Sequence, residues 1–295
     1  LNLNGSKSLT DVGLSQLRDL TELKDLDLSF TGTSGAGFKH LAGMRRLKRL
    51  ELPFGPIADA DLAHLRGLTA LTWLQLQATV PGITDAGLAH LKGLVNLEFV
   101  SIHSPDITSA GLVSLHDMAR LRDLNLNHTG VTALAPLRHL KALKSLSLGW
   151  TPIDDAELAP VAGMTQLKSL SLNQTKITDA GMAQLQGLTS LTHLNVGENK
   201  VTNAGLVHLA NLTNLQNLCL NHTAVDDAGL RQLARLNKLS LLFLEGTAIT
   251  DVGLARLQGL ATCKQIAVGG TNVTDAGIVA ARQRRSKTRF VRMGL

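Results

Sequence analysis

Aromatic residues are scarce in this sequence: its 295 residues include six phenylalanines, two tryptophans and no tyrosine. A core of this size must therefore be filled by aliphatic side chains, and leucine is abundant enough to fill it. Long apolar runs are also missing, since the longest are of the type Leu241–Leu244, and a membrane-spanning helix needs roughly 18 apolar residues. With 44% hydrophobic and 18% charged residues, the composition excludes long-range disorder.

The net charge of +6 is concentrated at one end of the chain. Six basic residues and no acidic ones occur from residue 282 onward: Arg282, Arg284, Arg285, Lys287, Arg289 and Arg292. The other 23 basic residues balance the 23 acidic ones. We therefore expect a solenoid over residues 1–281 and a basic capping segment over 282–295, in which Phe290 helps to close the last repeat. The alternative is a weak contact of this segment with an anionic partner.

One motif repeats along the whole chain. Its leading apolar residue recurs at Leu23, Leu47, Leu71, Leu97, Leu121, Leu143, Leu167, Leu191, Leu215, Leu239 and Cys263. Most steps are 24 residues, but a step of 26 inserts two loop residues near Thr79–Ile83, and a step of 22 shortens the helical side near Val131–Leu137. With a partial unit at Leu1, the repeat predicts twelve strands. Because the chain opens inside the pattern, we expect it to be a fragment or a processed product.

Each unit passes from a period of two, as in Leu146-Ser147-Leu148, to a period of three to four. This change predicts a short strand followed by a helix. The dipeptide Thr-Asp before many helical stretches, as at Thr178-Asp179, offers side-chain oxygens to the free amides of the first turn. Glycines just before the first helical leucine, as at Gly87, Gly111 and Gly181, would let each helix approach its neighbour.

A row of threonines follows the strands and is expected to point inward. Its members are Thr31, Thr79, Thr129, Thr151, Thr175, Thr223, Thr247 and Thr271. A buried hydroxyl needs a hydrogen-bond partner, and backbone groups of the adjoining turn are the natural ones. The row therefore predicts a polar ladder along the solenoid.

With these repeats, the chain resembles the leucine-rich repeat proteins over essentially its whole length. The Ile-Thr-Asp-Ala-Gly pattern at 177–181 is similar to the cysteine-containing, ribonuclease-inhibitor-like repeats of F-box proteins and to many bacterial members. Two departures are the threonine (Asn199 once) in place of the ladder cysteine, and the unit Leu121–Leu140, which resembles the shorter internalin-type repeat. The resemblance implies an α/β solenoid, a right-handed horseshoe of about 12 repeats, with a parallel sheet on the concave face and helices on the convex face. No appended catalytic domain is present, so no enzymatic role follows from the family.

Most of the aromatic residues fall on one predicted face. Residues between the inward leucines of the strands point into the concavity. When four outward positions are counted around each strand, six of the eight aromatics occupy them: Phe30, Phe54, Trp73, Phe99, Trp150 and Phe243. Trp73 and Phe99 share a column in adjacent repeats, as do Phe30 and Phe54, and strands about 4.8 Å apart place them side by side. The pattern favours a binding surface of rigid aromatic anchors. Alternatively, Phe30, Phe54 and Trp150 merely cover loop edges.

The same face is predicted to be mildly acidic and rich in neutral polar groups. Its acidic residues, Asp25, Asp27, Glu51, Asp123, Glu198 and Glu245, face a single basic one, Arg49. Such a surface suits a protein or peptide and makes nucleic acid unlikely in the groove. The candidate binding residues are Trp73, Phe99, Asp123, His128, Trp150, Phe54, Phe30, Glu51, Asn125 and Phe243.

Metal, disulfide and catalytic chemistry are not expected. His103 and His128 lie in neighbouring units near Asp123, but two histidines without a third ordered ligand form a weak zinc signal. No serine or cysteine is placed for nucleophilic catalysis beside a histidine and a carboxylate, so we expect no cofactor and no enzyme. Cys219 and Cys263 are two repeats apart, roughly 10 Å by strand spacing, and a disulfide tolerates about 7 Å. Both should be free thiols, which favours a reducing compartment such as the cytoplasm.

The leading interpretation is a non-catalytic protein-recognition module that binds a protein or peptide on its concave face. One alternative is a structural or scaffold solenoid. Another is the substrate-recognition part of a larger effector or enzyme, including an exported bacterial effector, whose catalytic domain is not in this chain.

Overall fold

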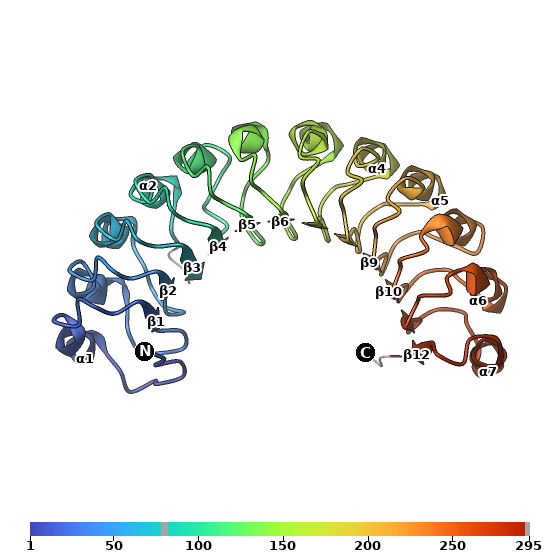
Figure 1. Cartoon of the computed structure of the whole chain (residues 1–295), viewed down its shortest axis with the longest axis horizontal. Coiled ribbons are helices and arrows are strands. Elements are labelled where there is room, and N and C mark those ends of the chain that lie inside the picture. Colours follow the sequence, from blue (N-terminus) through green and yellow to red (C-terminus); the bar gives the residue numbers. More distant parts are fainter. Residues whose placement is uncertain (78–81, 293–295) are drawn as a thin grey trace. The chain divides into compact units, whose positions relative to one another are not determined.

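The computed structural model describes residues 1–77 and 82–292, and the chain divides into two compact units, Leu1–Leu146 and Ser147–Leu295. The insertion expected at Thr79–Pro81 lies outside the described residues. In each unit the strands lie on the inner side and the helical segments on the outer side (Figure 1). This arrangement confirms the predicted leucine-rich repeat solenoid, with its sheet on the concave face.

The strands are parallel and follow chain order. In the first unit Leu26, Leu50 and Leu74 are consecutive register partners, and the Ser145 amide continues the pattern by donating to the Arg122 carbonyl. In the second unit β7 to β12 pair in sequence. The strands of the described residues are β1 Asp25–Asp27, β2 Arg49–Glu51, β3 Trp73–Gln77, β4 Phe99–His103, β5 Asp123–Asn125, β6 Ser145–Ser147, β7 Ser169–Ser171, β8 His193–Asn195, β9 Asn217–Cys219, β10 Leu241–Phe243, β11 Gln265–Ala267 and β12 Arg289–Val291.

The described ranges contain twelve strands, the expected number, but the unit at Leu1 does not supply one of them. The unit at Leu1 forms only an isolated bridge, between Asn2 and Asp27. The twelfth strand is β12, near the other end of the chain.

The helical segments are shorter than the periodicity suggests. The α-helices are α1 Asp11–Leu14, α2 Asp85–Ala89, α3 Ala159–Ala162, α4 Asp179–Gln184, α5 Asn203–Leu206, α6 Asp251–Arg256 and α7 Asp275–Arg284. The 3₁₀ helices are η1 Ser15–Leu17, η2 Gly35–His40, η3 Asp59–Leu65, η4 Gly111–Leu115, η5 Ala135–His139, η6 Asp155–Leu158, η7 Val207–Leu209, η8 Gly229–Arg235 and η9 Leu257–Gly259. Strands repeat every 4.8 Å or so, whereas packed α-helices need 8–10 Å. The tighter 3₁₀ turn reduces this mismatch.

Leucines from both sides of each repeat form the core. The strand residues Leu50 and Leu74 are fully buried, as are Leu88 and Leu94 from the helical side. Leu94 lies beyond the end of α2, in the turn that follows it. The period of three to four therefore identifies core positions correctly even where the backbone is no longer helical.

An inter-repeat ladder of carboxylates was missed by the sequence reasoning. Thr178 caps α4 as predicted, by accepting a hydrogen bond from the Ala180 amide. The aspartate at the first helical position has a different role: Asp155, which follows Asp154, accepts from the amide and hydroxyl of Thr178 in the next repeat, at 2.8 and 2.5 Å. The same two-bond rung joins Asp11 to Ser34, Asp59 to Thr84, Asp85 to Thr108, Asp179 to Thr202, Asp227 to Thr250 and Asp251 to Thr274.

The predicted threonine row is buried at Thr31, Thr129, Thr151, Thr223 and Thr247 and half-buried at Thr175 and Thr271, whereas Thr79 lies outside the described residues. The row is a ladder only in part. The Thr129 hydroxyl donates to the Leu126 carbonyl three residues earlier, at 2.6 Å, and Thr223 does the same to Leu220. These bonds stay inside one repeat. Asn199 differs because its side chain donates to the Leu172 carbonyl and accepts from Thr175, so it connects two repeats.

The basic residues near the carboxyl end take part in the fold. Arg285 donates to the carbonyls of Leu257 and Leu260, and Phe290 in β12 is 5% exposed. The expected boundary between residues 281 and 282 falls inside α7. That residues 282–295 cap the solenoid stays a prediction.

Candidate binding surface

Five outward side chains form one row across the strands of the first unit. Asp25, Arg49, Trp73, Phe99 and Asp123 are consecutive register partners from β1 to β5, and we call them the Trp73 row. The residues that follow them in each strand are buried, because side chains alternate between the two faces of a sheet. The row is therefore fixed by the leucine pattern and lies on the face opposite the core.

Three members of this row form a stack. The rings of Trp73 and Phe99 lie 3.4 Å apart between centroids, with 4° between their planes. The guanidinium carbon of Arg49 lies 4.1 Å from the Trp73 ring centroid, in a cation–π contact. Glu51 neutralises that cation, since its Oε1 accepts from Arg49 Nε at 3.0 Å and from Nη2 at 2.6 Å. The predicted pairing of Trp73 with Phe99 is present, and Arg49 extends it.

A second aromatic pair lies after the neighbouring strands. Phe30 and Phe54 are stacked with centroids 4.6 Å apart, and they are 53% and 42% exposed. Phe30 has a positive φ of 56°, a conformation that is uncommon for any residue but glycine. The predicted side-by-side arrangement is therefore present here as well, and both rings are open to solvent.

Asn125 and His128 lie in a polar part of the same unit. The Asn125 Oδ1 accepts from the Asn127 amide at 3.0 Å. The rings of His103 and His128 are 6.1 Å apart and meet edge to face. Burial lowers the pKa of His103, and the nearby His128 lowers it further, against a hydrogen bond to the Asn125 side chain that raises it. The described ranges bring no three His, Cys, Asp or Glu side chains into a metal-binding group.

Two of the candidate residues belong to the second unit. Trp150 is 42% exposed and has a positive φ of 56°. Phe243 has Cys219 and Ala267 as its register partners, so no aromatic neighbour lies beside it in the sheet. The stacked pairs are therefore a property of the first unit.

The two cysteines are free, as predicted. Burial is the main cause that raises the pKa of both the Cys219 and the Cys263 thiols.

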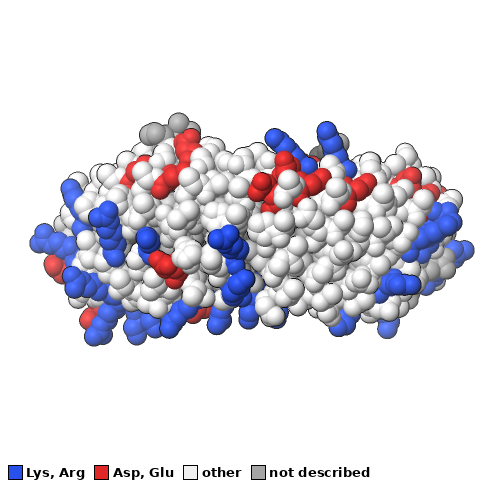
Figure 2. Space-filling view, turned by 90° about the horizontal axis from the view of Figure 1, so that it is seen from above, with Lys and Arg blue, Asp and Glu red and all other residues white. Residues whose placement is uncertain are grey.

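Charge is separated across the helical side in a way that the sequence total conceals. First turns of the helical segments carry acids such as Asp59, Asp85 and Asp179, and last turns carry bases such as Lys39 and Arg138. Figure 2 shows acidic side chains along one edge of this side and basic ones along the other. This distribution complements the helix dipole. The expectation of a neutral body with a basic tail holds for the sum of charges and misses this local pattern.

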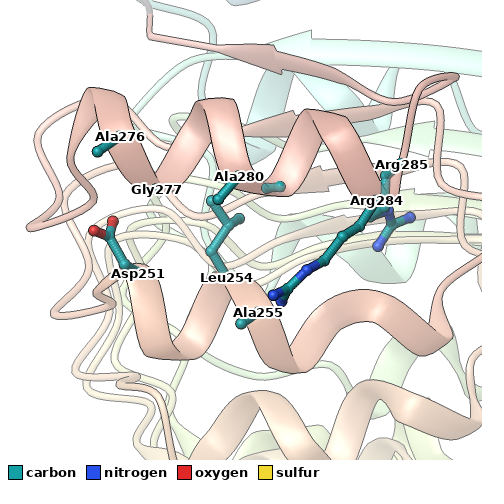
Figure 3. A pocket seen from close by; sticks show the side chains of 9 residues that line it. Asp251, Leu254, Ala255, Ala276, Gly277, Ala280, Arg284 and Arg285 are labelled. Carbon is teal, nitrogen blue, oxygen red and sulfur yellow. The ribbon is translucent and has the colours of Figure 1, made fainter.

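A cavity of about 270 Å³ lies between α6 and α7. Small side chains such as Ala276 and Ala280 line it, Leu254 forms part of its wall, and Arg284 extends beside it (Figure 3). The Asp251 carboxylate at one end already accepts two hydrogen bonds from Thr274. The cavity lies on the helical side of the second unit and contains none of the candidate residues.

The comparisons with known proteins agree with this fold. The leucine-rich repeat family model matches residues 165–225. An internalin from Listeria monocytogenes is 21% identical, with a TM-score of 0.66 over 95% of this chain and 83% of that one. Internalin C2 from the same organism is 27% identical, with a TM-score of 0.56 over 71% of this chain and 84% of that one. A TDR receptor is 14% identical, with a TM-score of 0.63 over 100% of this chain and 51% of that one. No curated protein matches by sequence.

Residues 165–225 thus match the leucine-rich repeat family, and the fold of the chain is a leucine-rich repeat solenoid similar to those of bacterial internalins. Within residues 1–77 and 82–292, no helix has the length and apolar composition to cross a membrane.

Proposed function

We propose that the strand face of the first unit binds a segment of a protein partner. The observation that carries the proposal is the pair of aromatic stacks on this face, Trp73 with Phe99 and Phe30 with Phe54. Tryptophan and arginine dominate the residues that contribute most to protein interfaces, and the Trp73 row places both side by side. Neutral polar groups such as Asn125 surround the stacks and suit the polar rim of an interface.

The energetic expectation follows from the size of these anchors. Truncating a well-packed aromatic anchor costs about 2 kcal/mol or more in binding, which is roughly a thirtyfold loss of affinity. Trp73 points away from the leucine core, so its removal leaves the fold intact. A loss of binding without a loss of stability is therefore the expected signature of Trp73→Ala.

The test compares matched variants of the full chain. The wild type is immobilised, partners are captured from a lysate of the source organism and identified, and the purified partner is titrated against each variant. We expect Trp73→Ala and Phe99→Ala each to weaken binding about thirtyfold. Val113→Ala is the control, because Val113 is 60% exposed in η4 on the helical side. Circular dichroism verifies that every variant is folded.

Two outcomes would overturn the proposal. If Trp73→Ala and Phe99→Ala bind as the wild type does while Val113→Ala does not, the partner uses the helical side. If no partner saturates any variant, the aromatic stacks are incidental and the chain is a structural solenoid.

A further inference from the structure

One end of the stack in the Trp73 row carries a cation of the chain, and the other end carries none. The stack runs across the sheet from β2 through β3 to β4, in the order Arg49, Trp73, Phe99. Because the two rings are nearly parallel and lie on adjacent strands, the second face of Phe99 is turned toward β5. The next residue of the row on β5 is Asp123.

Asp123 is not used by the fold. Of the side chains in the described part of the chain, none forms an ion pair or a hydrogen bond with its carboxylate. The nearby Arg122 pairs instead with Glu98, at 3.7 Å. Asp123 is the register partner of Phe99, and an aspartate is shorter than a phenylalanine, so a group that lies above the Asp123 carboxylate would meet the face of the Phe99 ring. On its other side the next residue in register is the small Ser145, whose amide donates to the Arg122 carbonyl.

The Arg49 end of the stack shows what such a space accepts. There, a guanidinium lies over an aromatic face, and a carboxylate, that of Glu51, takes up its hydrogen bonds. Phe99 and Asp123 offer the same two components, an aromatic face and an anionic acceptor. A cation over an aromatic ring gains about 0.5–2 kcal/mol, and hydrogen bonds to a carboxylate add to this.

We infer that the space between Phe99 and Asp123 is a subsite for a basic side chain of the partner, with arginine preferred to lysine. The planar guanidinium can stack on the ring and donate to the carboxylate at the same time, which an ammonium cannot do as well. This inference rests on the proposed function and specifies it: the partner segment presents an arginine. The remaining acidic residues of this face, including Asp25 and Asp27, favour a basic segment overall.

The test uses acetyl-arginine-amide as the probe, with acetyl-citrulline-amide as its neutral isostere. In the background Trp150→Phe, Trp73 is the single tryptophan, so its indole N–H gives one resonance that is followed by NMR. We expect a saturable shift with the arginine probe and none with the citrulline probe. Asp123→Asn should weaken the arginine probe about fivefold or more, and Phe99→Leu should do so as well. Asp117→Asn removes the same charge from an exposed position on the helical side and should change binding less than about twofold.

Three results would overturn the inference: equal shifts from both probes, no shift up to about 0.1 M probe, or a shift that Asp123→Asn leaves unchanged. The experiment contains no partner protein, so its result is separate from that of the proposed function. If capture of the partner needs Trp73 while the probe fails, only the arginine subsite is wrong. If the probe binds but Trp73→Ala captures the partner as well as the wild type does, the proposed function is wrong and the arginine subsite is still supported.

Discussion

The rung between Asp251 and Thr274 predicts an unusual response to a glycine-to-alanine change at Gly277. This glycine lies in the first turn of α7, directly opposite the carboxylate of Asp251 (Figure 3). A Cβ added at Gly277 would overlap that carboxylate, which supplies the three atoms nearest to it. The substitution Gly277→Ala must therefore displace the carboxylate from the Thr274 amide and hydroxyl, which donate to it at 2.8 and 2.7 Å.

The expected magnitude is the difference between two effects. A hydrogen bond to a charged group contributes about 1.5–3 kcal/mol. Since Asp251 is only partly buried, we expect about 2 kcal/mol for both bonds of the rung together. Alanine is favoured over glycine in a helix by up to about 1 kcal/mol. Gly277→Ala should thus destabilise the wild type by about 1 kcal/mol, and it should stabilise Asp251→Ala, where the obstacle is absent, by about 1 kcal/mol.

A double-mutant cycle measures this sign reversal. Urea unfolding of the wild type, both single variants and the double variant should give a coupling energy near 2 kcal/mol. Hydrogen exchange of α7 amides provides a local measurement, because unfolding of a repeat protein is not always two-state. If Gly277→Ala changed stability equally in both backgrounds, the carboxylate would not be the obstacle and the role assigned to the ladder would be refuted.

Three further predictions concern pH, thiols and the carboxyl end. The hydrogen bonds of its rung lower the pKa of Asp251. The stability that this rung contributes is therefore present above the ordinary pKa of about 3.9, and it is lost as the pH falls through the lowered pKa. Urea unfolding between about pH 2 and 6 should show that the pH dependence of stability is weaker in Asp251→Ala than in the wild type. Burial raises the pKa of the Cys219 and Cys263 thiols. A disulfide reagent at about pH 8 should therefore react slowly with both thiols in the folded chain and rapidly in urea. Fast labelling of both thiols in the native state would contradict the structure. Phe290→Ala should lower the free energy of unfolding by about 3–5 kcal/mol and lower the melting temperature. The control Arg284→Ala should change the free energy of unfolding by less than about 0.5 kcal/mol. An unchanged melting temperature for Phe290→Ala would argue against a capping role for this segment.

Periodicity predicts most of this fold because each repeat imposes the same burial pattern. The strands, their parallel order and the inward leucines follow from a fixed step of 24 residues. What periodicity does not specify is the backbone of the outer side. Leu88 and Leu94 read as one helix in sequence, but α2 ends at Ala89. The spacing of the sheet limits the width of each repeat, and this limit appears only when neighbours are packed together.

At the candidate site, too, the sequence predicts which residues are neighbours in the sheet but not the contacts that their side chains make. Columns of outward residues place Trp73 beside Phe99, and the structure confirms that pairing. The column alone also puts Arg49 next to Trp73, although its role as a stacked cation held by Glu51 depends on side-chain torsions. The Asp–Thr rungs were missed for a related reason. An aspartate at the start of a helix is normally explained by its own helix, and no sequence signal indicates that Asp155 turns to the next repeat instead.

Backbone conformation gives an independent reason to connect exposed side chains with function. The residue before the buried threonine is left-handed in several repeats, and in two of them it is glycine, Gly246 and Gly270. Where it is not glycine, the left-handed residue is Phe30, His128, Trp150, Gln174, Glu198 or His222, with φ between 51° and 58°. A non-glycine residue in this region costs of order 1–3 kcal/mol and persists where the surrounding structure compels it, often at binding sites. Glycine would serve the turn at lower cost, so folding alone does not explain a large ring there. Replacing Phe30 by glycine should therefore raise the stability of the chain or leave it unchanged, and it should weaken binding of the partner. A clear loss of stability in urea unfolding would show that the ring stabilises the fold instead.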